Sequence, residues 1–453
     1  MASTPLPEGI FSYLDTDLYK LTMQCAIFKF FSKVHVEYKF TNRTPHMRLD
    51  KKAFAWLQEQ IARLENIALS DDEYQFLKEE CKFLTEDYLS FLKNFRLRPK
   101  EHLKVAFTPV DDTEYGDLDI HTEGLWLDTI LYEIPLLALT SEAYFKFCDK
   151  DWDHQGQEEK AYNKGKTLFK AGCLVSEFGS RRRRDQHTQN LVVEGLVKAS
   201  EDAQKEGHSG KLTGTSNVYF AKKYGIPPVG TVAHEWYMGI AALTDDYEDA
   251  NELGLRYWHS CFGQGVLGIA LTDTFGTPAF FEAFKKRVPL ADKLPRDSDV
   301  LELIRTESRG DRTYAEVFTG VRQDSGDPKE YVKLAGDFYK SQGITGKTIV
   351  FSDSLNTERC IEYKGVAEAH GLKPSFGVGT FFTNDFMHKS DGTTKSKPLN
   401  IVIKISKAGG RPAVKISDDI GKNTGESETV QSVKARLGYS EHRWFGVEEN
   451  NRW

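Results

Sequence analysis

The segment Thr231–Trp236, with the sequence TVAHEW, places a histidine directly after the short apolar run 228–233. If this run is a strand of a βα barrel, it delivers His234 to the end of the barrel where active sites lie. A neutral imidazole near physiological pH can act as a nucleophile. One histidine at a strand end is more often part of the scaffold, so its role depends on the residues around it.

Five other short apolar runs are followed by charged or glycine-rich residues in the same way. The runs span 174–179, 266–271, 317–321, 348–352 and 375–379. The residues at or after their ends are Arg181, Asp273, Arg322 with Asp324, Asp353, and Gly379 with Thr380. Any one of these would pass for an ordinary loop residue. Because barrel strands open on one face at their C-terminal ends, six in succession predict a single site.

The chemistry of these residues favours a phosphorylated ligand. Arg322 directly after a buried strand is costly unless a carboxylate or an anionic ligand pairs with it. The backbone around Gly379 and the hydroxyl of Thr380 can cradle a phosphate, although the segment is not a P-loop. Asp273 and Asp353 at strand ends suit ribose hydroxyls or a Mg²⁺ ion shared with phosphates.

Four consecutive arginines, Arg181–Arg184, permit three interpretations. They form a solvated patch, a nuclear-localisation or RNA-binding run, or a phosphate site. The chain as a whole opposes RNA binding, since 60 Lys and Arg against 67 Asp and Glu give a net charge of -7.

Composition describes an ordinary globular protein of 453 residues, 40% of them hydrophobic. The six cysteines have no zinc or redox spacing, which fits reduced thiols in a cytoplasmic protein; a nuclear pool is left open. There is no signal-peptide pattern and no apolar run long enough to span a membrane, so we expect no membrane partner.

Strand and helix patterns define two parts of the chain. Residues 34–40 alternate as a half-buried strand, and 51–66 and 71–95 have the spacing of amphipathic helices. At the other end, 401–405 and 413–417 flank two glycines as a probable hairpin would. We predict an α/β fold, in which an irregular βα barrel at 141–389 packs on an α+β domain of 1–140 that about 390–453 completes. The charged segment 285–313 is interpreted as a solvent-exposed excursion.

Eight motifs in order along the chain closely resemble the nicotinate phosphoribosyltransferase family. They are DTDLYK (15–20), EFGSRRRR (177–184), GTSN (214–217), TVAHEW (231–236), LTDTF (271–275), VRQDSGDP (321–328), FSDSLN (351–356) and FGVGT (376–380). The resemblance implies a type II phosphoribosyltransferase barrel, packed on an α+β domain built from both chain ends. It also implies that nicotinate and phosphoribosyl pyrophosphate are joined in NAD salvage, with ATP and Mg²⁺ as cofactors.

The resemblance assigns expected roles to individual residues. His234 matches the histidine that ATP phosphorylates, which couples hydrolysis to condensation. The expected nicotinate-binding residues are Tyr19, Phe178, Ser216, Thr231 and Arg322. The expected phosphoribosyl pyrophosphate ligands are Arg181, Asp273, Asp324, Asp353, Gly379 and Thr380. Tyr19 is expected from a neighbouring subunit, which implies a homodimer with shared active sites.

Three alternatives remain open from the sequence. The related nicotinamide enzyme carries an acid at the position of Ser216, where it would repel a carboxylate, so serine favours nicotinate. Quinolinate would require a second cationic contact and would release CO₂. A non-enzymatic RNA-binding protein would use Arg181–Arg184 but would leave His234 and Asp353 without a role.

Overall fold

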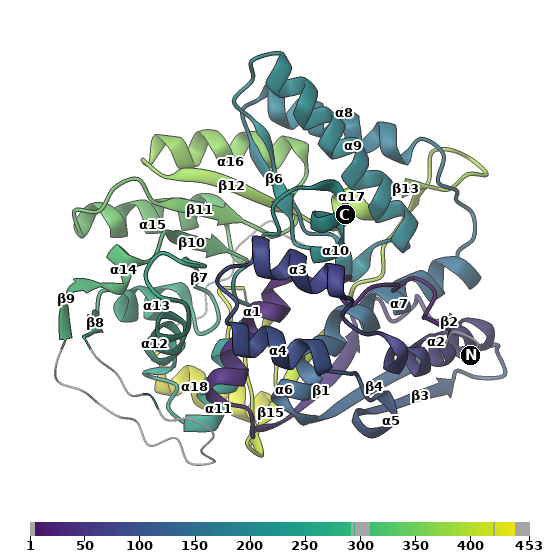
Figure 1. The fold of residues 1–453 in the computed structure, drawn as a ribbon, viewed down its shortest axis with the longest axis horizontal. Helices are drawn as coiled ribbons and strands as arrows, with labels where there is room; N and C mark the ends of the chain where they lie inside the picture. Colours follow the sequence, from purple (N-terminus) through teal and green to yellow (C-terminus); the bar gives the residue numbers. More distant parts are fainter. Residues whose placement is uncertain (1–4, 291–293, 295–308, 420–421, 440–453) are drawn as a thin grey trace.

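The computed structural model describes residues 5–290, 294, 309–419 and 422–439. Figure 1 shows two sheets, with helix α1 (Leu18–Phe30) between them. One sheet is antiparallel and the other is parallel, and each contains six strands. The predicted fold class is confirmed.

The antiparallel sheet takes strands from both ends of the chain, in the order β16-β15-β1-β4-β2 with β3 also paired to β4. Val36, Tyr38 and Phe40 of β1 are buried, as the alternation at 34–40 predicts. The strands are β1 (His35–Asn42), β2 (Leu49–Asp50), β3 (Leu103–Pro109), β4 (Tyr115–Leu125), β15 (Ile401–Ala408) and β16 (Arg411–Pro412).

The C-terminal hairpin turns at Gly409 and Gly410, whose φ angles of 57° and 78° explain why glycine stands at both positions. Its second arm is shorter than predicted, since only Arg411 and Pro412 pair with β15. Ala413 N–H still donates to Ser406 O of β15 at 2.9 Å, but the residues after it leave the sheet, and Ile416 N–H donates to Thr274 O at 2.9 Å. The predicted strand at 413–417 is therefore a crossing that carries the chain to the barrel.

The helices of the N-terminal part lie where the spacing of apolar residues predicts them, but one of the predicted helical stretches is divided in two. The helix expected over 71–95 is two helices, because the side chain of Thr85 accepts from Tyr88 N and starts a second one. The helices are α2 (Lys51–Arg63), α3 (Asp71–Glu80), α4 (Glu86–Asn94), α5 (Pro99–His102), α6 (Trp126–Thr129) and α7 (Glu133–Phe147), with 3-10 turns at Leu64–Asn66 and Ile130–Tyr132.

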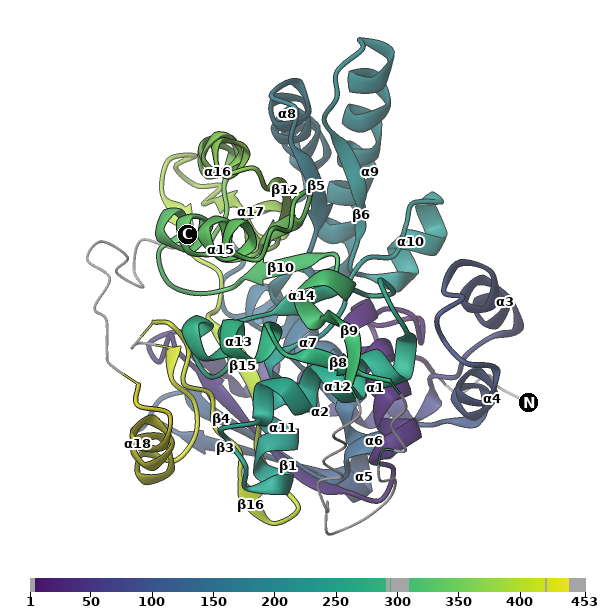
Figure 2. The same ribbon diagram turned by 90° about the vertical axis from the view of Figure 1, so that its left-hand side faces the viewer.

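The parallel sheet has the order β6-β5-β12-β11-β10-β7, so the C-terminal ends of all its strands lie at one edge. Its strands are β5 (Leu174–Glu177), β6 (Lys211–Thr215), β7 (Ile269–Leu271), β10 (Gly320–Gln323), β11 (Thr348–Phe351) and β12 (Lys373–Val378). The connecting helices are α8 (Gln157–Lys170), α9 (Gln186–Lys205), α10 (Val218–Tyr224), α11 (His234–Thr244), α12 (Ala250–Phe262), α13 (Thr277–Phe284), α14 (Tyr314–Val317), α15 (Pro328–Ser341) and α16 (Thr357–Ala369), with a 3-10 turn at Ser180–Arg182. Figure 2 shows α8 and α9 packed side by side at one end of this sheet.

The predicted strand at 228–233 is wrong. Within this stretch the only strand-type pairing is a bridge from Pro228 to Thr215 on β6. The hydroxyl of Thr231 donates to Ile269 O of β7 at 3.1 Å, so the segment touches both edge strands of the sheet. Pro227 and Pro228 lack N–H donors and Gly230 has φ of 148°, which prevents a regular ladder. The segment therefore closes the barrel irregularly.

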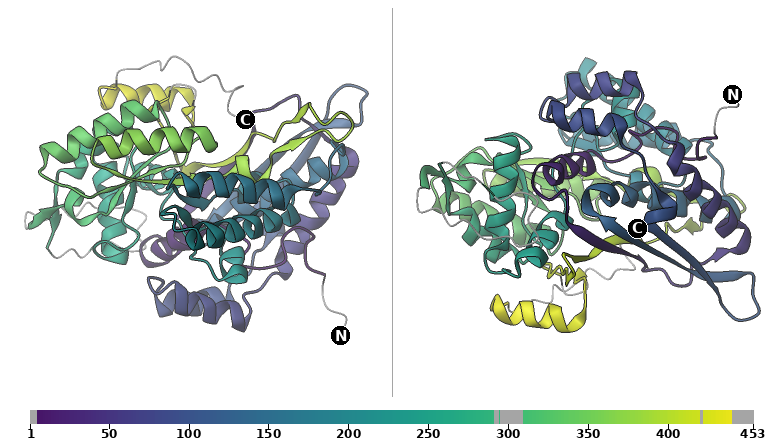
Figure 3. Two further views of the ribbon diagram at one scale, coloured as in Figure 1. Left: turned by 90° about the horizontal axis from the view of Figure 1, so that it is seen from above. Right: turned by 60° about the horizontal axis from the view of Figure 1, so that its bottom comes forward.

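The strand predicted at 317–321 lies three residues further on, because Tyr314–Val317 forms the short helix α14. The C-terminal half ends with α17 (Thr380–Thr383), β13 (Phe386–Met387), β14 (Lys395–Ser396) and α18 (Ser427–Arg436). Figure 3 shows the yellow helix α18 on the outside of the molecule.

A short antiparallel ribbon joins the two ends of the segment 285–313. It pairs β8 (Arg287–Pro289) with β9 (Arg309–Thr313). Most of the segment, including 295–308, lies outside the described residues, so its interpretation as an excursion stays a prediction.

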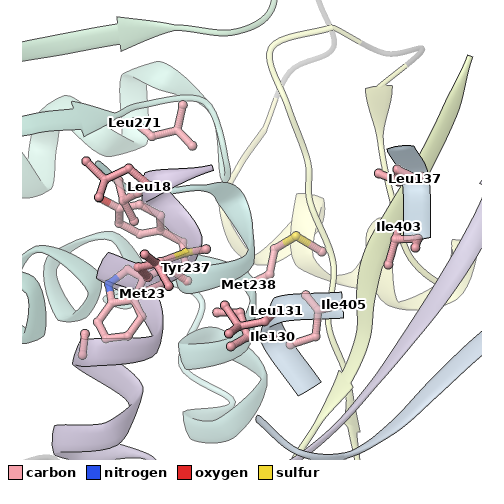
Figure 4. Packing of buried hydrophobic residues seen from close by; sticks show 14 of the residues in the cluster. Leu18, Met23, Ile130, Leu131, Leu137, Tyr237, Met238, Leu271, Ile403 and Ile405 are labelled. Carbon is pink, nitrogen blue, oxygen red and sulfur yellow. The ribbon is translucent and has the colours of Figure 1, made fainter. Parts of the chain in front are cut away.

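One apolar core joins the two parts of the chain. Figure 4 shows Leu18 and Met23 of α1 near Tyr237 of α11, with Met238 toward Ile405 of β15. Burying such side chains contributes on the order of 1.5–3 kcal/mol each. The helix that begins at His234 is thus held between the barrel and the antiparallel sheet. Among the described helices, none has the length and apolar character needed to cross a membrane.

Candidate active site

A cavity of about 590 Å³ lies at the C-terminal edge of the parallel sheet and is bounded on its other side by β15. It is lined by Tyr19, Phe178, Arg181, Ser216, Thr231, His234, Arg322, Asp324, Asp353, Gly379 and Thr380. Every residue predicted for the site therefore lines one cavity, with the exception of Asp273. Asp273 is buried behind the wall, with Oδ1 3.8 Å from His234 Nε2.

His234 is the first residue of α11, not the residue after a strand. Its Nδ1 lies 3.0 Å from Thr274 Oγ1. Its Nε2 lies 3.0 Å from Asp324 Oδ2 and 2.9 Å from Lys415 Nζ. When Lys415 donates to Nε2, the ring proton is on Nδ1 and points at Thr274, and the single lone pair of Nε2 accepts the hydrogen bond from the lysine, so Lys415 must turn to another acceptor before Nε2 can act as a nucleophile. With the proton on Nε2 instead, the ring donates to Asp324.

Burial and the positive charge of Lys415 lower the pKa of His234 to about 4. The two carboxylates, Asp273 and Asp324, act in the opposite direction but do not outweigh them. The imidazole is therefore neutral from about pH 5 upward, the state in which it is a nucleophile.

We expect Lys415→Met to move the pH below which the His234-dependent rate falls upward by about one to three pH units, because the variant removes one of the two causes that lower the pKa of His234 and keeps both carboxylates that raise it. A rate profile between pH 5 and 8 measures this, and the unchanged protein should be flat between pH 6 and 8. Lys422→Met is the matched variant, since Lys422 lines the same cavity without touching His234. Lys422→Met should lower the rate without changing the pH at which the rate begins to fall. If Lys415→Met also leaves that pH unchanged, Lys415 does not control the pKa of His234.

The two carboxylates predicted as magnesium ligands differ in their surroundings. Asp273 Oδ2 accepts from Ser325 Oγ at 2.5 Å and from Lys415 Nζ at 3.1 Å. With His234 and Asp324 it forms a group whose ligand atoms lie within 4.8 Å of one another. Magnesium prefers oxygen ligands, and the ammonium of Lys415 already contacts two members of this group, so the group fits the ion poorly. Asp353 also has a lysine neighbour, Lys422, on one of its oxygens, but it lines the cavity and Asp273 does not, so Asp353 is the better placed of the two.

Tyr19 and Phe178 reach the cavity from α1 and from the end of β5. Tyr19 lines the cavity of its own chain, and the expectation that it serves the site of a neighbouring subunit stays a prediction. Leu18 N–H donates to Ser216 O at 2.7 Å, which fixes the start of α1 on the barrel. Phe178 leaves no room for a side chain at residue 377, where a Cβ would lie 2.3 Å from its ring, so Gly377 is required for this ring position.

Arg322 is the third residue of β10, not a residue beyond it, as the shift of this strand requires. Its Nη1 donates to Val232 O at 3.2 Å and its Nη2 lies 3.5 Å from Asp324 Oδ1. Its buried Nε has no hydrogen-bond partner among the described residues. A cation with an unfilled donor on the cavity wall is suited to an anionic ligand.

Ser216 is directed at a carboxylate of its own chain. Its hydroxyl donates to Asp17 Oδ1 at 2.8 Å, and the hydroxyl of Ser180 donates to the same oxygen at 2.7 Å. Burial raises the pKa of Asp17, while these two donors act against that rise. The serine therefore masks part of a negative charge that also lines the cavity.

The arginine run is not a surface patch. Arg183 is fully buried on Asp15, with two N···O distances of 2.8 Å, and Arg184 is buried with its guanidinium 3.6 Å from the Phe145 ring centre. Arg181 lines the cavity and lies 3.6 Å from Glu133. The interpretation as an RNA-binding run is therefore wrong.

Three cavity lysines were missed by reasoning from the sequence. Lys404 on β15, Lys415 and Lys422 come from the C-terminal part and face the barrel residues. Burial and the neighbouring Lys415 lower the pKa of Lys404 to about 7. For Lys404 and Lys415 the signal was a lysine inside each of the apolar runs IVIKI and AVKIS, since a charge there needs a partner, whereas Lys422 lies in no such run.

Comparisons with known proteins agree with this geometry. Residues 173–441 match the model of the nicotinate phosphoribosyltransferase (NAPRTase) family, and residues 14–141 match its N-terminal domain. A probable nicotinate phosphoribosyltransferase of Schizosaccharomyces pombe is 48% identical over 431 residues, covering 95% of this chain and 98% of that protein. The nicotinate phosphoribosyltransferase of Saccharomyces cerevisiae is 44% identical over 449 residues, covering 98% of each chain.

This chain is also similar in structure to solved proteins. A crystal structure from Saccharomyces cerevisiae has a TM-score of 0.88 at 43% identity and covers 96% of this chain and 100% of that one. The crystal structure of nicotinate phosphoribosyltransferase from Porphyromonas gingivalis has a TM-score of 0.77 at 32% identity and covers 95% of this chain and 100% of that one.

Proposed function

The chain belongs to the nicotinate phosphoribosyltransferase family, and from this premise we propose how its cavity performs and drives the reaction. The protein is a nicotinate phosphoribosyltransferase, an enzyme of pyridine nucleotide biosynthesis. Its substrates are nicotinate and phosphoribosyl pyrophosphate.

In the transfer step the pyridine nitrogen attacks C1 of the ribose while the bond from C1 to the pyrophosphate oxygen breaks. Nicotinate stacks between Tyr19 and Phe178 with its carboxylate on Arg322, beside Thr231. Arg181 takes the pyrophosphate, and Gly379 with Thr380 take the 5-phosphate at the start of α17. Positioning and charge stabilisation by these groups lower the barrier.

Asp353 and Asp324 face the same space from β11 and β10. They would orient the ribose hydroxyls or, with Asp353 as a ligand, hold magnesium, which when bound offsets charge on the pyrophosphate. Asp273 acts indirectly in this scheme, through Lys415 and His234.

In the coupling step, His234 Nε2 attacks the γ-phosphorus of ATP. The new N–P bond forms as the bond to the ADP oxygen breaks, and water later releases orthophosphate from the histidine. The observation that carries this proposal is a neutral His234 whose Nε2 lies between Lys415 and Asp324 at the cavity wall. Lys415 is placed to meet the negative charge of the arriving phosphoryl group.

The first test is product formation from nicotinate and phosphoribosyl pyrophosphate with and without ATP, measuring nicotinate mononucleotide and ADP together. Mononucleotide that rises with ATP and is matched by ADP supports both steps. If mononucleotide forms at the same rate with and without ATP, and no ADP appears, the coupling step is overturned and the transfer step stands.

Ser216 gives a test of base selection. We expect Ser216→Asp to lower the ratio of kcat/KM for nicotinate over nicotinamide by about 10²-fold, because a second carboxylate beside Asp17 repels the nicotinate carboxylate. Ser216→Asn is the matched control, with nearly the same shape as Asp and no charge, and it should keep most of the preference. Comparable kcat/KM for the two bases in the unchanged enzyme would refute the proposed substrate choice.

The predicted homodimer and the cytoplasmic location belong to this proposal as well. Sedimentation of the purified enzyme and fractionation of cells test them. A monomer with full activity would remove the shared-site dimer from the scheme.

A further inference from the structure

Helix α1 and helix α11 each carry in their first turn a residue that faces the cavity and is followed directly by a charged residue. Tyr19 and His234 line the cavity, and Lys20 and Glu235 follow them directly. Lys20 Nζ lies 2.5 Å from Glu235 Oε2, and its side chain is fully buried. The residue that stacks on the base and the proposed phosphate acceptor are thus joined by a direct ion pair between their chain neighbours.

The pair belongs to a closed set of charges. Lys20 Nζ also lies 2.5 Å from Glu133 Oε2, and Glu133 Oε1 lies 3.6 Å from Arg181 on the cavity wall. Two cations thus meet two carboxylates, so the set has no net charge. Removing one member alone leaves an uncompensated buried charge, which destabilises the fold.

Glu235 is held rigidly on its other side. Its Oε1 accepts from Trp126 Nε1 at 2.7 Å and from the hydroxyl of Tyr38. Trp126 and Tyr38 lie on α6 and β1, within the shared core. A displacement of Lys20 is therefore transmitted to the first turn of α11 rather than absorbed by a mobile side chain.

A second connection runs parallel to the first. The hydroxyl of Thr22 donates to Thr231 O at 2.6 Å, three residues before His234. A Cβ at Gly230 would lie 3.2 Å from Tyr19 N, so the two backbones approach closely at this point. The start of α1 is thus tied to both sides of His234.

We infer that Lys20 is a positioning residue that couples occupation of the base site at Tyr19 to the reactivity of His234. A base that stacks on Tyr19 fixes the first turn of α1, and the Lys20–Glu235 pair passes this restraint to the first turn of α11. Because coupling between two sites is reciprocal in binding, phosphorylation of His234 also changes the affinity for nicotinate. The inference rests on the proposed phosphohistidine.

The test compares ATP turnover with and without nicotinate, at saturating phosphoribosyl pyrophosphate, in the full-length enzyme. The informative variant is Lys20→Met with Glu235→Gln. It removes one positive and one negative charge and leaves Glu133 paired with Arg181, so no buried charge is stranded. The glutamine side chain that replaces Glu235 keeps an oxygen that can accept from Tyr38 and Trp126.

We expect nicotinate to change ATP turnover by at least about fivefold in the unchanged enzyme and by less than about twofold in the double variant, which lacks the ion pair between the two helices. Thr22→Val removes only the hydrogen bond from Thr22 to Thr231 O and should lose part of the nicotinate response. If the double variant does not fold, Thr22→Val is tested by the same measurement. Lys29→Met is the control. Lys29 also ties α1 to the barrel, through Ser260 O at 2.6 Å, but it lies at the far end of α1 and outside the cavity lining.

A purely structural role for Lys20 would lower stability and total rate but would leave the nicotinate response unchanged, and that result would overturn the inference. A nicotinate response that is unchanged in both the double variant and Thr22→Val would also overturn the inference. Absence of acid-labile phosphate on the unchanged enzyme would instead refute the phosphohistidine itself, so the two failures are distinguishable.

Discussion

Replacement of His234 by alanine is expected to lower ADP formation by at least about 10²-fold while mononucleotide synthesis continues at the ATP-independent rate. The reason is that the transfer step uses the pyridine nitrogen as its nucleophile and needs no protein nucleophile. His234 contacts Thr274, Asp324 and Lys415, so its loss removes the phosphate acceptor and leaves the base site in place. Mononucleotide and ADP measured in one reaction give the ratio directly.

A matched histidine separates this effect from a general loss of stability. His259 lies on α12, outside the cavity lining, and burial lowers its pKa as it does that of His234. His259→Ala should keep the ratio of ADP to mononucleotide. Unchanged coupling in His234→Ala would mean that another residue accepts the phosphate.

Replacement of Arg322 by methionine is expected to lower kcat/KM for nicotinate by about 10²- to 10³-fold, since removing one partner of a buried ionic contact costs on the order of 3–5 kcal/mol. The effect on nicotinamide should be much smaller, because that base carries no carboxylate. Steady-state rates with the two bases provide the comparison.

Two further variants refine the prediction for Arg322. Arg322→Lys keeps the charge but loses the planar fork, so it should recover only part of the activity. Arg312→Gln changes an arginine on the exposed strand β9 and should leave both bases unaffected. Equal losses for nicotinate and nicotinamide in Arg322→Met would show that Arg322 supports the cavity wall and does not select the carboxylate.

The sequence was sufficient for the elements that show a simple period. Strand β1 has alternating buried residues, and the strands β5, β11 and β12 lie where short apolar runs end in polar residues. The gathering of Arg181, Arg322 and Asp353 could be predicted, because parallel strands bring their C-terminal ends to one edge.

The local pattern of apolar residues could not predict where strands begin and end when this depends on contacts with distant parts of the chain. The apolar run before His234 has strand-forming residues, but two prolines and the backbone of Gly230 keep it from forming a ladder. The position of Arg322 shifted because Thr313 caps a short helix that the apolar pattern of 317–321 does not reveal.

Contacts between distant parts of the chain could not be predicted from the sequence either. Lys415 meets His234 across 181 residues, and neither residue carries a local sign of the other. Another such contact is the bridge from Asp17 to Asn217, which holds the start of α1 on the barrel across 200 residues.

The sheet that mixes both chain ends has a consequence for synthesis. Strand β1 needs β15 as its neighbour, and the two are more than 350 residues apart, so a chain emerging from the ribosome carries an unfilled edge on β1 until residue 408 has followed. The lysines that face His234 and Asp353 arrive later still, with residues 415 and 422. Contacts this remote slow folding, because a long loop must close before they form. The nascent chain therefore lacks a finished cavity until residue 422 has been synthesised.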